Sequence, residues 1–98
     1  MTDEQIKSRF AEAGDFVTRT LRCGGNPIYA YYIDGLTSGG DISEYVFKPI
    51  SENLSGSMEE AYDAALHGAV YNSAVSVCED VDEAALKLVN GFCIVLFP

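Results

Sequence analysis

Two stretches of the chain are apolar from end to end. Residues 28–33 (IYAYYI) and residues 92–97 (FCIVLF) contain no charged side chain and no alternation of apolar with polar positions. A strand shows such a run when both of its faces are covered, whereas a strand with one solvated face alternates. The two runs therefore predict the inner strands of a sheet that is packed on both sides.

Two further strands are predicted from weaker patterns. Residues 16–23 are rich in β-forming side chains, but Arg19 interrupts their more apolar side, which favours a position near the sheet edge. The turn-forming residues 24–27 (GGNP) come next, so this strand and the following apolar run are expected to pair as an antiparallel hairpin. Residues 70–77 alternate on one face and predict a fourth strand.

Helical spacing of apolar residues, together with capping residues, predicts four helices. Residues 3–13 form a short amphipathic helix, in which Ile6 and Phe10 lie one above the other. Pro49 removes a backbone donor and predicts that the second helix kinks or ends near Phe47. Each helix after the first begins with a capping box, a short acceptor side chain followed three residues later by Glu. The three pairs are Asp41 with Glu44, Ser57 with Glu60, and Asp80 with Glu83.

The predicted order of elements is α-β-β-α-α-β-α-β. A chain of 98 residues is near the usual size of one domain, so we expect a single α/β domain over residues 1–98. Helices lie in the last two connections between strands, which implies right-handed parallel crossovers and a mixed sheet of about four strands with helices packed on it. Pro98 follows the last apolar run directly, which suggests a fragment of a longer protein.

The charge of the chain is strongly acidic and unevenly placed. The net charge is -9; residues 1–50 carry five basic and seven acidic side chains, and residues 51–98 carry one basic and eight acidic side chains. Binding to a phosphate backbone needs the opposite balance, so nucleic acid is a poor partner. The acidic half fits either a solvated surface or a docking surface for a basic partner.

The chain also lacks the patterns of exported and membrane-spanning proteins. No apolar run approaches the ~20 residues of a membrane-spanning helix, and the N-terminus has no secretory signal, so we expect this part of the chain to be soluble by itself. The three cysteines, Cys23, Cys78 and Cys93, form no C-x-x-C pair, which favours free thiols in a reducing compartment.

The loop after the first apolar run carries the candidate ligand-binding residues. Asp34 follows residues 28–33 at the carboxyl end of the predicted strand, where α/β sheets tend to place groups that contact ligands. Thr37 and Ser38 add hydroxyl groups a few residues later. The alternative is that Asp34 only stabilises the turn through hydrogen bonds to the backbone.

No other cluster favours catalysis or a cofactor. Four carboxylates at residues 79–83 lack the spacing of a calcium loop and fit a helix N-terminus, so no metal site is predicted. His67 is the only histidine, and neither a nucleotide motif nor a catalytic set accompanies it. The tyrosines Tyr29, Tyr31 and Tyr32 are expected in the core or at an interface, not as a platform for bases. We expect neither an enzyme nor a cofactor.

Three segments resemble the GerA-type spore germination protein family. Residues 32–36 (YIDGL), followed by Ile42, Glu44 and residues 48–50 (KPI), are similar to the opening signature of that family. Residues 15–17 (DFV) resemble the strand before this signature, and residues 88–97 (LVNGFCIVLF) resemble a later segment. The resemblance spans residues 15–97, with a poorly matching middle over residues 51–69.

The resemblance implies the first subdomain of the A subunit of a nutrient germinant receptor. Such a receptor has a larger chain with a membrane-spanning part, lies in the spore inner membrane, and has partner subunits and small nutrient ligands such as amino acids or sugars. We therefore expect a domain involved in nutrient sensing or signal coupling, which meets the membrane only through the rest of the chain. One alternative is a protein-interaction domain that docks through Phe10, Tyr62 or Phe97. A small stand-alone enzyme is the other alternative, against which the missing motifs count.

Overall fold

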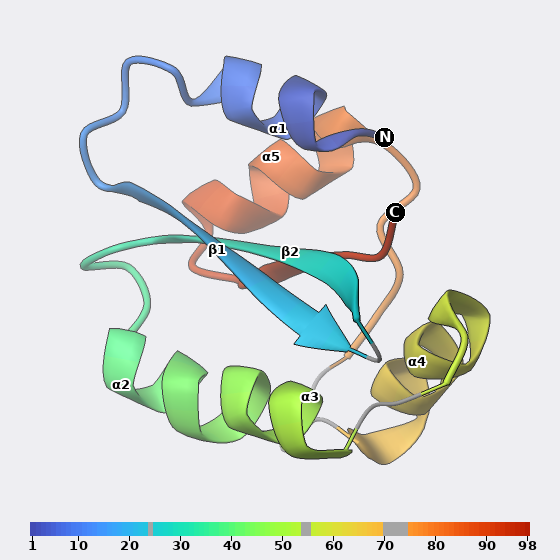
Figure 1. Cartoon of the computed structure of the whole chain (residues 1–98). Coiled ribbons are helices and arrows are strands. Elements are labelled where there is room, and N and C mark those ends of the chain that lie inside the picture. Colours follow the sequence, from blue (N-terminus) through green and yellow to red (C-terminus); the bar gives the residue numbers. More distant parts are fainter. Residues whose placement is uncertain (24, 54–55, 70–74) are drawn as a thin grey trace.

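The computed structural model of the chain describes residues 1–23, 25–53, 56–69 and 75–98. The chain folds into a three-stranded sheet with helices on both faces (Figure 1). In chain order the elements are α1 (Asp3–Arg9), β1 (Phe16–Cys23), β2 (Asn26–Ile33), α2 (Gly39–Ile42), η1 (Ser43–Phe47), α3 (Lys48–Asn53), α4 (Met58–Ala64), η2 (Ala65–Ala69), α5 (Val81–Val89) and β3 (Ile94–Leu96).

The strand β2 lies in the middle of the sheet, as its apolar run predicts. The strand order is β1-β2-β3, and both pairs are antiparallel. The predicted hairpin of β1 and β2 is confirmed, with a register that runs from Phe16 opposite Ile33 to Cys23 opposite Asn26. Successive side chains of β2 point to opposite faces of the sheet, so each face needs its own helical cover.

Two hydrophobic cores lie on the two faces of the sheet. Figure 1 shows α1 and α5 over one face, and α2, α3 and α4 over the other. The first core is Leu21, Ile28, Ala30, Tyr32, Ile42, Val46, Phe47, Ile50, Ala61 and Ala65. The second core is Ile6, Tyr31, Ile33, Ala84, Leu88 and Ile94. This double cover explains why residues 28–33 contain no polar position.

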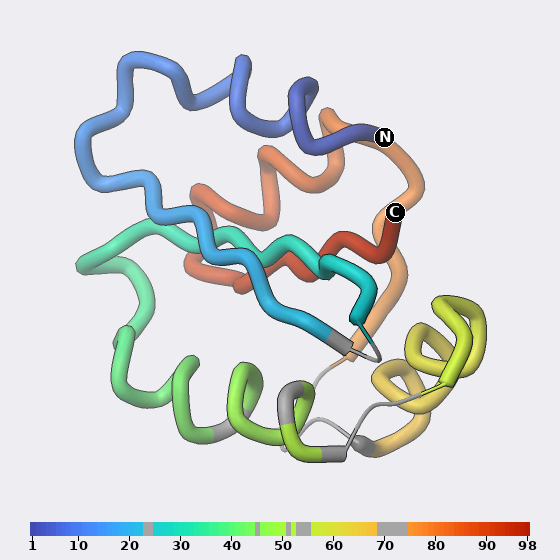
Figure 2. Tube along the Cα trace, viewed as in Figure 1, coloured from blue at the N-terminus to red at the C-terminus, as the bar shows by residue number. Residues whose placement is uncertain are grey.

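The prediction of parallel crossovers is wrong for β2 and β3, which pair antiparallel. Figure 2 shows the reason: after β2 the chain returns along α2 to α3, and it then passes back along α5 before it enters β3. The chain reverses its direction on entering each of the two helical passes and again on entering β3, so after three reversals β3 runs against β2. A parallel strand would follow a single pass.

Residues 92–97 were expected in an inner strand, but within the described residues β3 is an edge strand of three residues. Its side chains alternate between the two cores, because the helical layers extend over the sheet edge as well. Covered faces therefore explain the apolar run without an inner position. The predicted fourth strand covers residues 70–77; residues 70–74 lie outside the described residues, and residues 75–77 form a connection and no strand.

Pro49 does not end the second helix. The helical backbone continues from α2 through η1, a π-helical turn, to the end of α3. A proline in a helix lacks the N–H that bonds one turn back, and the wider π-helical turn over Ser43–Phe47 ends two residues before Pro49. The predicted end near Phe47 is therefore wrong, and at that residue the π-helical turn passes into the α-helix α3.

The first helix is shorter than predicted, and one cap differs. The helix α1 ends at Arg9, and Phe10 instead stacks on Phe16 with ring centroids 4.8 Å apart. The predicted capping box of Asp41 and Glu44 is wrong, because Ser38 caps α2. Among the described residues, no helix is long and apolar enough to cross a membrane.

Candidate functional site

The candidate loop after β2 lies at the surface. The Asp34 side chain is exposed, and its backbone N–H donates a hydrogen bond of 2.8 Å to the carbonyl oxygen of Asp15. An isolated bridge joins Asp34 to Thr37, and Gly35 takes a positive φ of 92° between them. The backbone of this loop is therefore fixed by the end of β1 and by its own turn.

The two hydroxyl groups of the loop are engaged in the fold. The Thr37 hydroxyl donates a hydrogen bond of 2.6 Å to the carbonyl oxygen of Gly91, which joins the loop to the turn between α5 and β3. The Ser38 hydroxyl oxygen accepts the backbone N–H of Asp41 at 3.3 Å and so caps α2. Both residues lie close to Asp34 in sequence, but their hydroxyl groups serve other partners.

A groove of about 220 Å³ lies elsewhere, beside β3. Residues 92–97 form one wall, and residues 75–78 contribute to the lining from the connection before α5. The rest of the lining is Met1, Val46, Ile50, Tyr62, Ala65, Leu66 and Lys87. The candidate loop residues Asp34, Thr37 and Ser38 do not line it.

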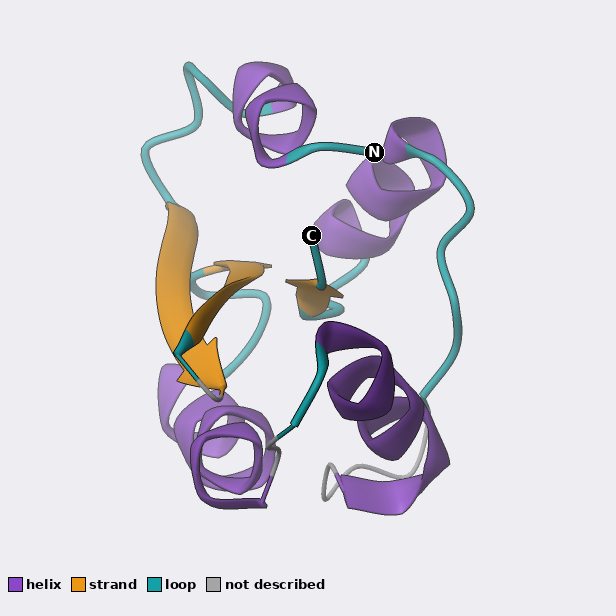
Figure 3. Cartoon of the chain, turned by 45° about the vertical axis from the view of Figure 1, so that its right-hand side comes forward, coloured by secondary structure: helices purple, strands orange, loops and turns teal. Residues whose placement is uncertain are grey.

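The groove runs along the outer edge of β3. A cavity over one face of a strand touches every second residue, because successive side chains point to opposite faces. This groove instead touches six consecutive residues, 92–97, on both sides of the strand. In Figure 3 the short strand beside the C-terminus is β3, and it lies on the side of the sheet that faces the connection to α5.

Exposed apolar side chains gather at this groove. Val75, Val77, Tyr62 and Phe92 all line it and are exposed, although each is a large apolar residue. Phe97 meets Tyr62 edge-on, with ring centroids 5.5 Å apart. An apolar concavity with exposed aromatic and branched side chains is suited to another polypeptide or to an apolar molecule.

The polar groups of the groove are few. The Lys87 ammonium lies 4.7 Å from the ring centroid of Phe92, a cation–π contact at the lining. Burial raises the pKa of the Cys93 thiol to about 12, and burial followed by the nearby Glu83 raises the pKa of the Cys78 thiol. Both thiols are free, as predicted, and both favour the neutral form. The side chain of Cys23 lies outside the described residues.

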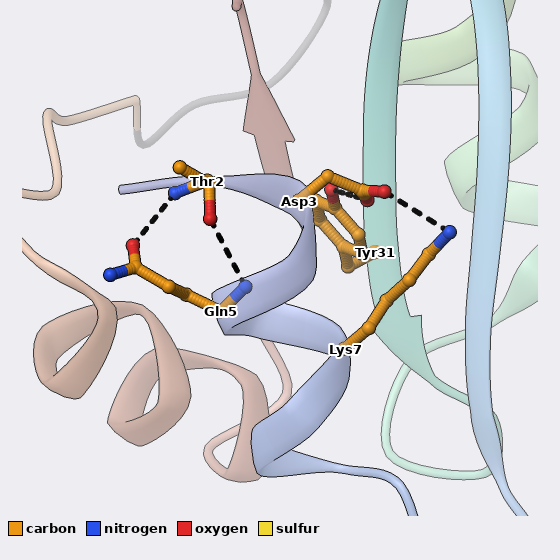
Figure 4. A network of polar contacts seen from close by, with 5 residues as sticks. All are labelled: Thr2, Asp3, Gln5, Lys7 and Tyr31. Atoms are coloured by element: carbon orange, nitrogen blue, oxygen red, sulfur yellow. Dashed lines mark hydrogen bonds and ion pairs between the residues drawn. The ribbon is translucent and has the colours of Figure 1, made fainter.

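A polar network near the N-terminus holds α1 on the sheet (Figure 4). The Tyr31 hydroxyl donates a hydrogen bond to the Asp3 carboxylate, which also pairs with Lys7 at 3.1 Å. Thr2 and Gln5 complete a capping box at the start of α1, with Thr2 N–H to Gln5 Oε1 at 2.9 Å. Burial, followed by the hydrogen bond to Asp3, raises the pKa of Tyr31 well above its usual range. Every group in this network has a structural role.

The acidic cluster before α5 is also used by the fold. Asp80 accepts the Glu83 backbone N–H at 2.9 Å, Glu83 accepts the Glu79 backbone N–H at 3.0 Å, and Asp82 pairs with Arg9. The Nδ1 atom of His67, in η2, lies 3.2 Å from the Asp63 carboxylate of α4. Over the described ranges, no three metal-binding side chains converge. Tyr31 and Tyr32 are buried, as expected for core aromatics.

Sequence reasoning missed the groove. Its walls come from segments that are separated along the chain, and the interpretation of residues 92–97 as an inner strand gave the strand no free edge. One signal was available: Tyr62 and Phe97 were named as residues of an exposed apolar face, and both line the groove. Phe10, named with them, packs in the second core instead.

Comparison with known proteins gives a family match over nearly the whole chain. The family model described as Bacillus/Clostridium GerA spore germination protein matches residues 4–98. This match confirms the resemblance inferred from residues 32–36, 42–50 and 88–97. No curated protein and no solved structure matches the chain.

Proposed function

The chain belongs to the Bacillus/Clostridium GerA spore germination protein family, and from that premise we propose that it is the N-terminal domain of a germination receptor A subunit that couples a signal between receptor components. In this role the domain docks on another receptor subunit, and the groove beside β3 is the contact surface. Family membership carries the link to germination, and the apolar groove supports the choice of docking over nutrient binding.

The character of the groove is the main support for docking. Its exposed apolar residues, such as Val77 and Phe92, lose contact with water only when another surface covers them. Small polar nutrients need convergent donors and acceptors. The groove offers Lys87 and Ser76 for that purpose, and most of the remaining lining is apolar. A polypeptide partner therefore fits this surface better than a sugar.

A pair of valine variants in the full-length receptor tests the docking function. Val77 is 43% exposed and lines the groove, whereas Val89 is 54% exposed on α5 and does not. Both valines are exposed, so an aspartate at either position should change domain stability by about 1 kcal/mol or less, a limit that includes the effect of the α5 dipole on a charge at position 89. We expect Val77→Asp to weaken the germination response and Val89→Asp to leave it intact, at equal receptor abundance. An unchanged response of the Val77→Asp receptor would contradict docking at the groove.

Nutrient sensing at the candidate loop is the second function. The Asp34 carboxylate favours it, since it is exposed at the end of the central strand and accepts no hydrogen bond within the described residues. Asp34 would hold an ammonium or hydroxyl group of a nutrient such as an amino acid or a sugar. Thr37 and Ser38 would line the loop without changing their present hydrogen bonds.

The Asp34→Asn receptor tests this second function. The change keeps the size of the side chain and removes the charge, so a sensing role predicts a shift of the nutrient dose-response to higher concentration. Asp41→Asn, another exposed carboxylate change near the same loop, is the matched control. If the dose-response of Asp34→Asn equals that of the control at equal abundance, the loop is structural and the sensing role is lost.

We expect the receptor to meet the membrane only through the rest of its chain. We propose that the full-length protein lies in the spore inner membrane and that this domain lies outside the bilayer, against other receptor subunits. Spores are prepared with a receptor that carries an epitope tag either in the Asp34 loop or on α5. Fractionation of these spores locates the full-length protein. Recovery outside the inner-membrane fraction would contradict this assignment.

A further inference from the structure

The outer edge of β3 has the geometry of a site for one more strand. An edge strand presents unpaired backbone N–H and C=O groups on its outer side, and such groups pair readily with another extended chain. Within the described residues, β2 pairs with one edge of β3 and no strand pairs with the other. The groove lies along this second edge, since it touches all of residues 92–97.

The walls of the groove would also receive the side chains of an added strand. The side chains of a strand point alternately to the two faces of a sheet. On one face of the edge lie Ile50, Ala65 and Leu66, and residues 75–78 and Lys87 contribute to the lining as well. The helical layers of Figure 3 thus extend past β3 on both sides. An incoming strand would bury apolar side chains against these layers.

The charges near the groove indicate which side chains the ends of the added strand should carry. Carboxylates flank the lining segments: Glu59, Glu60 and Asp63 lie on α4 beside Tyr62, and Glu79 follows Cys78 directly. Lys87 is the only basic residue of residues 51–98, which hold eight acidic ones. Positive side chains on the incoming segment would therefore be attracted to both rims of the groove.

The same charge disfavours a second copy of this chain. Two copies that met at this edge would each bring a net charge of -9, with the greater part in residues 51–98. Like charges at a shared edge oppose association. The occupant that fits the surface is a different chain with the opposite charge.

We propose that the groove beside β3 binds, by strand addition, an extended apolar segment of a partner receptor subunit that is flanked by lysine or arginine residues. The proposal rests on the docking function proposed above and adds the mode of binding and the chemistry of the partner. Backbone pairing with residues 92–97 gives orientation, apolar side chains fill the groove, and the basic flanks meet the acidic rims.

A designed peptide tests the proposal on the 98-residue chain. The probe alternates valine and threonine over about six residues, carries two lysines at each end, and is followed by fluorescence anisotropy. One control has glutamates in place of the lysines, and the other keeps the lysines but is methylated on its central backbone amides. At low salt we expect the Glu-flanked and methylated controls to bind at least tenfold more weakly than the probe, and the first difference to shrink at high salt.

The matched valine variants locate the binding. Val77→Asp should weaken probe binding at least tenfold, and Val89→Asp should change it less than twofold. Equal binding of the methylated peptide would overturn strand addition, and so would equal loss in the two variants. A dimer that Val77→Asp abolishes in sedimentation would assign the edge to a second copy and overturn the proposal as well. The docking function fails on a different result, an unchanged germination response of the Val77→Asp receptor.

Discussion

Tyr31 is fully buried, although its side chain ends in a hydroxyl group. Its ring stacks on Phe16 with centroids 5.9 Å apart, and its hydroxyl donates to the Asp3 carboxylate. A buried hydroxyl without a hydrogen-bond partner destabilises the fold. Packing of the Tyr31 ring buries its hydroxyl, and Asp3 provides the acceptor that this hydroxyl needs. This hydrogen bond, together with the packing of Ile6 in the same core, ties α1 to the central strand.

Removal of that hydroxyl should loosen α1. Tyr31→Phe keeps the ring but removes a hydrogen bond to a charged acceptor, so we expect the free energy of unfolding to fall by about 1–2 kcal/mol in urea denaturation. Tyr29→Phe is the control, because the Tyr29 hydroxyl makes no hydrogen bond within the described residues and should change stability by less than about 0.5 kcal/mol. Equal losses of stability in the two variants would show that the hydrogen bond of the Tyr31 hydroxyl adds nothing to the free energy of unfolding.

Cys93 gives the domain a pH dependence in alkaline solution. Burial raises the pKa of its thiol from 9.0 to about 12. Below pH 9 the thiol is neutral in both states, and its contribution to stability is fully present. As the pH rises above 9 the unfolded chain loses this proton first, so stability falls until the folded chain ionises as well.

The expected difference can be measured with one substitution. Between pH 8 and pH 10 the wild-type chain should lose on the order of 1 kcal/mol more stability than the Cys93→Ala variant, by urea denaturation at each pH. The loss of packing in Cys93→Ala lowers stability at both pH values and cancels in the comparison. Parallel stability profiles would mean that the folded chain ionises this thiol as easily as the unfolded chain does.

At the scale of elements, the turn between α5 and β3 joins the candidate loop to the groove. Gly91 ends α5 with a positive φ of 88°, and a Cβ placed there would lie 3.2 Å from the carbonyl oxygen of Leu36. The Thr37 hydroxyl donates to the Gly91 carbonyl oxygen from the same loop. This hydrogen bond therefore holds the turn before β3 against the loop after β2, and the close approach of Leu36 leaves little room for a side chain at Gly91.

A side chain at Gly91 should strain this turn. We expect Gly91→Ala to lower the free energy of unfolding by about 1–2 kcal/mol, since alanine at positive φ is strained and Leu36 is close. Gly14→Ala is the matched control, because Gly14 has no positive φ and no atom within 4 Å of its added Cβ. Thermal unfolding followed by circular dichroism compares the two. A loss at Gly14 as large as that at Gly91 would rule out the conformational reason.

The sequence predicted individual helices and strands better than their arrangement in space. Ser57 and Asp80 cap their helices as expected, because a cap depends on residues within one turn. Asp41 does not cap α2, since Ser38 starts the helix one turn earlier and Gly39 and Gly40 adopt helical backbone despite their low propensity. The direction of β3 depends on the number of helical passes before it, which no local pattern of residues specifies.

At the scale of the molecule, the groove needed the fold before it could be found. The prediction for Asp34, Thr37 and Ser38 used a rule about strand ends, and these residues do lie together in one loop after β2. The groove depends instead on Tyr62, Val77 and Phe92, which lie far apart in sequence and meet only because β3 is placed at the sheet edge. Tertiary placement of this kind leaves no periodic signal in the chain.

The net charge also acts on the whole molecule. With 15 acidic and 6 basic side chains, the folded chain carries an excess of nine carboxylates. Their mutual repulsion is stronger in the compact state than in the unfolded chain, so salt that screens it should stabilise the fold. We expect the melting temperature to rise by a few degrees between about 20 mM and 300 mM NaCl.

Two glutamates separate this repulsion from local effects. Glu52 lies in the last turn of α3, where a negative charge opposes the helix dipole, and Glu59 lies in the first turn of α4, where the dipole favours it. Glu52→Gln and Glu59→Gln each change the net charge from -9 to -8, because one of 15 acidic side chains is removed. At low salt Glu52→Gln should raise stability and Glu59→Gln should lower it, each by about 0.3–1 kcal/mol, and this difference should shrink at high salt because salt also screens the helix dipole. The opposite dipole effects cancel in the mean of the two variants, so we expect that mean to show a smaller salt dependence than the wild-type chain. If the wild-type melting temperature does not change with NaCl, repulsion among the carboxylates is too weak to matter, and a difference between the two variants would come from the helix ends alone.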